Sequence, residues 1–268
     1  MKAKAVVFDM DDTLLRDDRS ISPYTQEVLH RAAKAGVHVI PASGRAQSSM
    51  TPFVDMLGCA SAYIACNGAE IWSPDHQLLH QEALTVEEAR ECAVFAAEND
   101  CHAQVYYGDK FYYSHNGEYA RAYEKSSMMK GEYVGDLLAF IDRPLCKFLM
   151  TDTPERIAEL YGMAKERFAG RAAITCSKPY FLEINPLRAS KGIALAEAGR
   201  ILGFDASEAV AFGDGLNDLS MLQAAGVGVA MANAWPQVKE IIPVHCLSNM
   251  EDGVARFIEE NILKEAEA

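Results

Sequence analysis

The sequence contains neither a long apolar run nor a cluster of basic residues. No stretch approaches the roughly 20 apolar residues that a membrane-spanning helix needs, and the amino terminus leads into a strand pattern rather than a signal peptide. Lys and Arg number 25 against 38 Asp and Glu, which gives a formal charge of −13. Because nucleic acids and anionic membranes bind clustered cations, we expect neither as a partner. The expected location is the cytoplasm.

Several cofactor and metal motifs are also missing. There is no Gly-x-x-x-x-Gly-Lys-Ser/Thr, no Gly-x-Gly-x-x-Gly and no His-Glu-x-x-His run, so a nucleotide P-loop, a Rossmann cofactor site and a zinc-hydrolase site lose their usual support. The seven cysteines are scattered without any Cys-x-x-Cys spacing. We interpret them as reduced thiols that serve mainly as small hydrophobic side chains.

The chain is long and apolar enough for a substantial hydrophobic core. Its 268 residues are 50% hydrophobic and 24% charged, as expected for one large or two modest globular domains. The patterns before residue 66 alternate short apolar runs with helical segments and predict a βαβαβ order, hence a parallel sheet. The expected strands are 5–8, 37–42 and 62–65, and the expected helices begin at Pro23 and Ala46.

A second pattern begins near residue 84. It predicts an αββαβαββ unit, with a hairpin of strands 103–107 and 110–113, that is inserted into the first unit and ends at Asn185-Pro186. After it come a helix from Lys191, a strand at 209–212 and a strand at 227–230. The predicted domains are therefore residues 1–83 with 186–268, and an inserted α/β domain of residues 84–185.

Polar residues gather where the apolar strands end. Asp9 and Asp11 follow the first strand, Ser43 follows the second, Lys191 begins a helix, and Asp214 opens the run Gly213-Asp214-Gly215-Leu216-Asn217-Asp218. In open α/β sheets, ligands bind beyond the carboxyl ends of the strands. Acids suited to Mg²⁺, a hydroxyl, a lysine at a helix amino terminus and glycine-rich turns together favour a magnesium and phosphate site. Taken singly, the Asp9 and Asp11 pair could be only a solvated acidic turn.

Four motifs in this order resemble those of the haloacid dehalogenase-like superfamily. They are Asp9-x-Asp11-x-Thr13, Ser43-Gly44-Arg45, Lys191-Gly192 and Gly213-Asp214-Gly215-x-Asn217-Asp218. The large insert between the second and third motifs resembles the α/β cap of the Cof-type sugar-phosphate phosphatase branch. The resemblance covers effectively the whole chain and implies a Rossmann-like parallel-sheet core with an inserted α/β cap.

The resemblance also implies roles for the acids. Asp9 would be the nucleophile that forms an aspartyl-phosphate, and Asp11 the general acid and base. Asp9, Asp214 and the carbonyl of Asp11 would hold Mg²⁺, with Asp218 supporting the metal or the lysine. One departure is visible, since Asp12 stands where glycine is common in the family. Side-chain alternation along an extended chain would turn Asp12 away from Asp11.

The phosphate-binding groups follow from the same resemblance. They would be the amides of Met10 and Gly44 and the side chains of Ser43, Lys191 and Asn217. The expected activity is Mg²⁺-dependent hydrolysis of small phosphate monoesters, with sugar phosphates as the first candidate substrates and a cofactor phosphate such as pyridoxal phosphate or FMN as the next. A phosphotransferase or mutase, and a non-catalytic phosphosugar-binding regulator, are the alternatives. The sequence indicates neither the substrate nor the oligomeric state.

Overall fold

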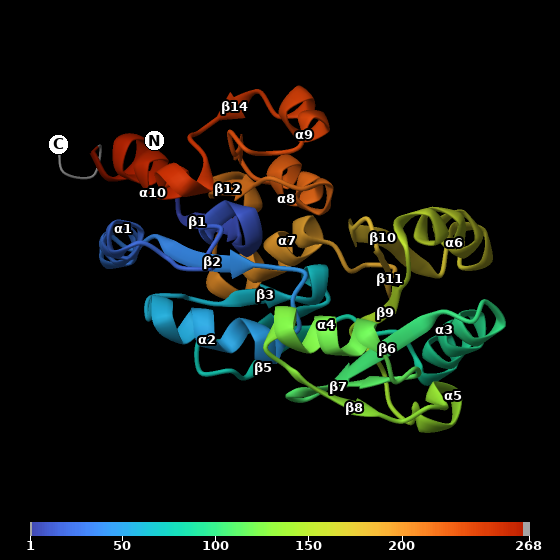
Figure 1. Ribbon diagram of the computed structural model, residues 1–268. Helices are drawn as coiled ribbons and strands as arrows, with labels where there is room; N and C mark the ends of the chain where they lie inside the picture. The colour runs from blue at the N-terminus through green and yellow to red at the C-terminus, as the bar shows by residue number, and fades with distance from the viewer. Residues whose placement is uncertain (1, 265–268) are drawn as a thin grey trace. The chain divides into compact units, whose positions relative to one another are not determined.

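The structure is a computed structural model that describes residues 2–264 (Figure 1). The chain divides into two compact units. The first, here called the core unit, contains the residues up to Ser43, Thr51–His80 and the described residues from Ser190 onward. The second, the insert unit, contains Gly44–Met50 and Gln81–Ala189. Among residues 2–264, no helix has both the length and the apolar character needed to cross a membrane.

An eight-stranded sheet forms the centre of the core unit, in the order β14-β13-β12-β1-β2-β3-β4-β5. Strands β14 to β3 of this order pair in parallel, whereas β4 pairs antiparallel with β3. The central strand β1 is buried along its whole length because all its residues except the last are apolar. The strands are β1 (Ala5–Asp9), β2 (His38–Ala42), β3 (Tyr63–Ala65), β4 (Glu70–Trp72), β5 (Leu78–Gln81), β12 (Ala209–Gly213), β13 (Val227–Ala230) and β14 (Val244–His245).

The helices of this part of the chain begin and end at the residue types that usually start and stop helices. Ser22 caps α1 through a bond from the Thr25 amide, and Gly203 ends α7 in a left-handed conformation. The helices are α1 (Pro23–Lys34), α2 (Gln47–Leu57), α7 (Lys191–Leu202), α8 (Leu219–Ala224), α9 (Pro236–Ile241) and α10 (Gly253–Ile258), with short helical turns η1 (Met10–Leu14), η2 (Cys66–Gly68), η3 (Ala206–Glu208), η4 (Leu216–Asp218), η5 (Asn249–Glu251) and η6 (Glu259–Leu263).

A six-stranded sheet in the order β10-β11-β9-β6-β7-β8 forms the insert unit. The predicted αββαβαββ pattern was incomplete, because the structure adds the strand β8 and the four-residue helix α5. The strands are β6 (His102–Tyr107), β7 (Lys110–Tyr113), β8 (Lys130–Tyr133), β9 (Phe148–Thr151), β10 (Ala172–Lys178) and β11 (Phe181–Pro186), and the helices are α3 (Val86–Glu98), α4 (Glu118–Ser127), α5 (Leu137–Phe140) and α6 (Pro154–Arg167).

The hydrophobic core of the insert unit joins α3 and α6 to one face of this sheet. Alternate residues of β6, β9 and β11 belong to it, among them Val105, Phe148 and Ile184. Because side chains alternate along a strand, the residues between them point to the opposite face. That opposite face carries several buried polar side chains, namely His102, Gln104, Thr151, Glu183 and Asn185.

Candidate active site

Asp9 is the last residue of β1, and it is buried, with 6% of its surface exposed. The chain does not stay extended beyond it, because residues Met10–Leu14 form a tight turn in which Asp12 has a left-handed φ of 61°. The extended backbone on which the predicted alternation of Asp11 and Asp12 depends is therefore interrupted at Asp12. Asp12 is exposed, Asp11 is half-buried and Met10 is fully buried.

Lys191 is the first residue of α7 and has no exposed surface. Ser190 caps this helix by accepting a hydrogen bond from the Ile193 amide, which fixes the helix start and with it the lysine. The ammonium group of Lys191 donates to Asp9 Oδ1 and, at 2.6 Å, to Asp218 Oδ1. The structure thus brings together three of the residues that the sequence predicted, from three separate elements.

Asp214 and Asp218 lie on the turn that follows β12. The second oxygen of Asp218 accepts hydrogen bonds from the amides of Asp214, at 3.0 Å, and Gly215, at 2.9 Å. Thr13, on the turn after β1, donates to Asp214 Oδ1 at 2.8 Å. One carboxylate oxygen from each of Asp9, Asp214 and Asp218 lies within 4.8 Å of the others. The cluster therefore joins the ends of two adjacent parallel strands, β1 and β12.

Burial and mutual repulsion perturb these acids. Burial, followed by the charge of Asp218, raises the pKa of Asp214 to about 7, although the hydrogen bond from Thr13 opposes the change. Burial also raises the pKa of Asp9 well above its ordinary value, against the lowering effect of Lys191. Burial tends to lower the pKa of Lys191, but Asp218 and Asp9 outweigh it, so this pKa is raised. The cluster holds more negative charge than one lysine balances.

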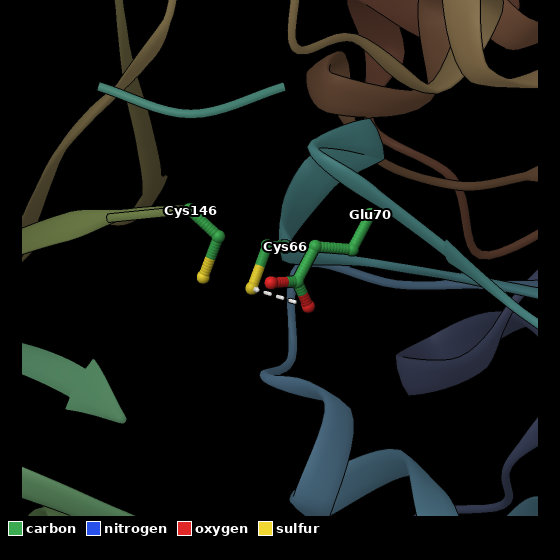
Figure 2. A group of neighbouring side chains, drawn as sticks. All are labelled: Cys66, Glu70 and Cys146. Carbon is green, nitrogen blue, oxygen red and sulfur yellow. Dashed lines mark hydrogen bonds between the residues drawn. The ribbon is translucent and has the colours of Figure 1, made fainter. Parts of the chain in front are cut away.

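A divalent cation fits this donor set. The three carboxylates offer the hard oxygen ligands that Mg²⁺ prefers, and a cation would counter the burial and the repulsion that raise the pKa of Asp9 and of Asp214. Another acid, Glu70, accepts a hydrogen bond from the Cys66 thiol at 4.0 Å (Figure 2). Trp72 Nε1 donates to the same oxygen at 3.0 Å. Glu70 Oε2 thus accepts two hydrogen bonds at the turn after β3.

Asn67, which sequence reasoning did not single out, links Ser43 to Asn217. Ser43 is buried directly after β2, and its carbonyl accepts a hydrogen bond from the Asn67 amide at 3.0 Å. The side-chain oxygen of Asn67 accepts from Asn217 Nδ2 at 3.2 Å. Asn67 has a φ of 55°, a conformation that Asn tolerates better than most residues, and this preference was the available signal.

Two asparagines of the carboxyl-terminal region bind the turn that follows β1. Asn233 Nδ2 donates to the Asp12 carbonyl at 2.6 Å, and Asn233 Oδ1 accepts from the Asn249 amide at 3.1 Å. Asn249 Nδ2 in turn donates to the Leu15 carbonyl at 3.0 Å. We call this connected pair, Asn233 and Asn249, the asparagine brace.

Comparison with known proteins places the chain in a family. Residues 6–258 match the family of haloacid dehalogenase-like hydrolases. The chain belongs to this family. It is 30% identical, over 97% of its length and 96% of the relative's, to 5-amino-6-(5-phospho-D-ribitylamino)uracil phosphatase YcsE of Bacillus subtilis. It is also 30% identical, over 90% and 88% of the two chains, to HMP-PP phosphatase of Serratia proteamaculans.

A solved structure has the same fold. The haloacid dehalogenase-like hydrolase from Bacteroides thetaiotaomicron superposes with a TM-score of 0.88 at 29% identity, over 97% of this chain and 99% of the other. The predicted family and α/β fold class are confirmed, and so is the expectation of an enzyme of the phosphoric monoester hydrolase class. The roles of the individual residues stay predictions.

Proposed function

We propose that the protein is a Mg²⁺-dependent phosphatase that hydrolyses small phosphate monoesters, with sugar phosphates as the first candidates, through an aspartyl-phosphate on Asp9. The observation that carries this proposal is the buried cluster in which Lys191 binds both Asp9 and Asp218 while Asp214 lies beside them. Phosphoryl transfer depends mainly on positioning and charge neutralisation. A buried cluster of three carboxylates and one lysine would supply both the positioning and the charge neutralisation.

The metal would be held by the carboxylates of Asp9 and Asp214 together with the carbonyl of Asp11. Asp218 stays on Lys191 and on the amides of Asp214 and Gly215, so it supports the cluster from outside the ligand set. When bound, the cation would neutralise the carboxylates and the phosphoryl oxygens. The same neutralisation would restore the ionised form of Asp9 that a nucleophile requires.

The reaction would proceed in two steps. A carboxylate oxygen of Asp9 attacks phosphorus, the bond from phosphorus to the ester oxygen breaks, and Asp11 gives its proton to the departing alkoxide. Water then attacks the phosphorus of the aspartyl-phosphate and gives a proton to Asp11, which releases inorganic phosphate and regenerates the Asp9 carboxylate. Phosphoryl oxygens would be bound by the Met10 and Gly44 amides, Ser43, Lys191 and Asn217.

The names of the relatives support a second candidate substrate class. The Bacillus relative is named for a phosphorylated ribityl chain attached to a uracil ring. A phosphate ester on a cofactor or cofactor precursor, in which a polyol joins an aromatic heterocycle, therefore stands beside the simple sugar phosphates. A screen of both classes at equal concentration, ranked by kcat/KM, would separate them.

Release of phosphate from p-nitrophenyl phosphate tests the mechanism. We expect activity that requires Mg²⁺ and falls at least about 10³-fold in Asp9→Asn, because a missing nucleophile is not replaced by its neighbours. Asp75→Asn, an exposed acid of the core unit, is the matched control and should keep full activity. Activity that survives chelation, or an Asp9→Asn variant as fast as the control, would disprove the mechanism. The cytoplasmic location stays a prediction that fractionation of cells would check.

A further inference from the structure

The insert unit contains a buried ion pair that the proposed reaction does not use. Lys147, just before β9, and Glu183, on β11, each keep only 3% of their side-chain surface exposed. Their charged groups lie 3.3 Å apart, between Lys147 Nζ and Glu183 Oε1. A buried pair of this kind is a poor source of stability, because removing two charges from water costs about as much as their attraction returns. Its presence therefore calls for another explanation.

The surroundings of Lys147 hold its ammonium group in one place. The ring of Tyr106 lies under it, with the nitrogen 5.0 Å from the ring centre. Glu183 is itself held, because its other oxygen accepts a hydrogen bond from Thr175 Oγ1 at 3.2 Å. Neighbouring strands of one sheet thus fix both the lysine and its counter-charge.

The third contact of Lys147 is with a backbone carbonyl. Its ammonium group donates to the carbonyl oxygen of Gly44 at 2.8 Å, a distance typical of a strong charge-assisted hydrogen bond. Gly44 belongs to the same compact unit as Lys147 and directly follows Ser43 in the chain. A glycine has the widest choice of backbone angles, so an external hydrogen bond to its carbonyl restricts it more than any other residue.

We propose that Lys147, held by Glu183, is a positioning residue that orients Gly44 for phosphate binding. This inference rests on the proposed function, in which the Gly44 amide and the Ser43 hydroxyl bind phosphoryl oxygens. The hydrogen bond from Lys147 fixes the carbonyl of Gly44. It thereby limits rotation of the Gly44 backbone, to which the amide also belongs. Lys147 need not touch the substrate, and its loss should weaken phosphate binding and turnover together.

Four variants test the proposal in the full-length protein. Lys147→Met removes the contact with Gly44 but leaves the buried Glu183 carboxylate without its counter-charge, so the stability of this variant should also fall. The double variant Lys147→Met/Glu183→Gln removes both charges and should recover most of the thermal midpoint. Glu183→Gln breaks the ion pair but keeps the donor to Gly44. Lys110→Met/Glu132→Gln removes an exposed Lys–Glu pair of the same sheet, 3.1 Å apart, and is the matched control.

The readouts are the thermal midpoint, kcat and KM for p-nitrophenyl phosphate, and the inhibition constant for inorganic phosphate. We expect the double variant to stay about 10- to 100-fold below wild type in kcat/KM, with weaker inhibition by phosphate, even though its midpoint recovers. The control pair should stay within about twofold of wild type. A double variant that regains wild-type kinetics would show that the pair is only structural and would overturn the proposal.

If the double variant does not fold, the single variants decide. Glu183→Gln should keep kcat/KM well above that of Lys147→Met, because only the former retains the bond to Gly44, and equal losses would overturn the proposal. Wild-type activity in the same assay separates the two hypotheses. A wild type without phosphatase activity contradicts the proposed function, whereas an active wild type with unaffected lysine variants contradicts only the role of Lys147.

Discussion

Asp214 is an acid of the site whose protonation should affect stability near neutral pH. Burial and Asp218 raise its pKa from 3.8 to about 7 in the folded protein. The folded state therefore retains a proton that the unfolded state has already released, so this group makes the metal-free protein less stable as the pH rises from about 4 to about 7. Most surface acids with lowered pKa values are ionised in both the folded and the unfolded state above about pH 5. Their titration therefore does not change the stability between about pH 5 and about pH 7.

Urea unfolding in chelator at about pH 5 and about pH 7.5 measures this effect. Wild type should be more stable at the lower pH, and Asp214→Asn should reduce the difference, because its amide stays neutral while the Thr13 hydroxyl can still donate to it. Asp75→Asn is the control and should retain the wild-type difference. An Asp214→Asn variant with the same pH dependence as wild type would contradict the assignment.

At the residue scale, the sequence predicted the residues that belong to motifs and missed residues that lie outside them. Asp9, Lys191 and Asp214 are recognisable because each lies where an apolar strand ends or a helix starts. Asn67 and Lys147 lie in segments without a motif, and only the folded chain brings them to their partners. Such contacts are tertiary, and no local pattern of residue types encodes them.

The turn η2 and the start of α7 approach each other closely at Gly68. Gly68 has a φ of 98°, and a Cβ there would lie 2.3 Å from the Ser190 carbonyl oxygen. Gly36 has a similar φ of 84° but open space around the same position. Gly36→Ala should therefore cost about 1 kcal/mol from backbone strain alone, whereas Gly68→Ala should cost several kcal/mol and displace Lys191. Urea unfolding and kcat/KM of both variants check this, and equal costs would exclude the steric explanation.

The asparagine brace should control the turn that carries Asp11. Asn249→Ala leaves the buried carbonyl of Leu15 without its donor, so we expect a loss of about 1–3 kcal/mol in stability together with a lower kcat. Asn99→Ala is the control, because Asn99 also donates to a carbonyl, that of Phe95, but lies in the insert unit. It should cost stability without changing kcat. An Asn249→Ala variant that loses stability but keeps kcat would restrict the brace to a structural role.

At the element scale, sequence patterns predicted the elements with a clear apolar pattern and missed several short elements without one. Strand β8 reads Lys-Gly-Glu-Tyr and is largely exposed, so it has no apolar alternation, and its pairing with β7 alone makes it a strand. Strand β5 is exposed in the same way at the end of the other sheet. The four-residue α5 is too short for a helical period to be visible. These elements depend on their neighbours rather than on their own sequences.

At the scale of the whole molecule, the order of the motifs was more informative than any single one. Each motif is short, but four of them, at strand ends and at a helix start, together predict a sheet whose strand ends meet at one site. The structure brings Asp9, Lys191, Asp214 and Asp218 together at such strand ends. The pattern of the sequence changes near residue 84, and one of the two compact units contains Gln81–Ala189 together with Gly44–Met50. The substrate could not be predicted, because no motif in the sequence indicates which side chains would select it.

The free cysteines allow the two units to be followed separately. Cys66 is fully buried in the core unit and Cys92 is buried in the insert unit, where burial also raises the pKa of its thiol. A buried thiol reacts with an alkylating reagent only after its surroundings open. Mass spectrometry after brief alkylation in increasing urea therefore gives an unfolding midpoint for each unit.

Mg²⁺ should stabilise the core unit, because the proposed metal ligands Asp9 and Asp214 both lie there. At about ten times its Kd, the ion adds about 1.4 kcal/mol, which corresponds to roughly 0.5–1 M in the urea midpoint. We expect Cys66 to show this shift and Cys92 to show a smaller one if the units open independently. Asp214→Asn should abolish the Cys66 shift. If Cys66 still shows the Mg²⁺-dependent shift in Asp214→Asn, the metal binds outside the carboxylate cluster, because a ligand stabilises only the structure that binds it.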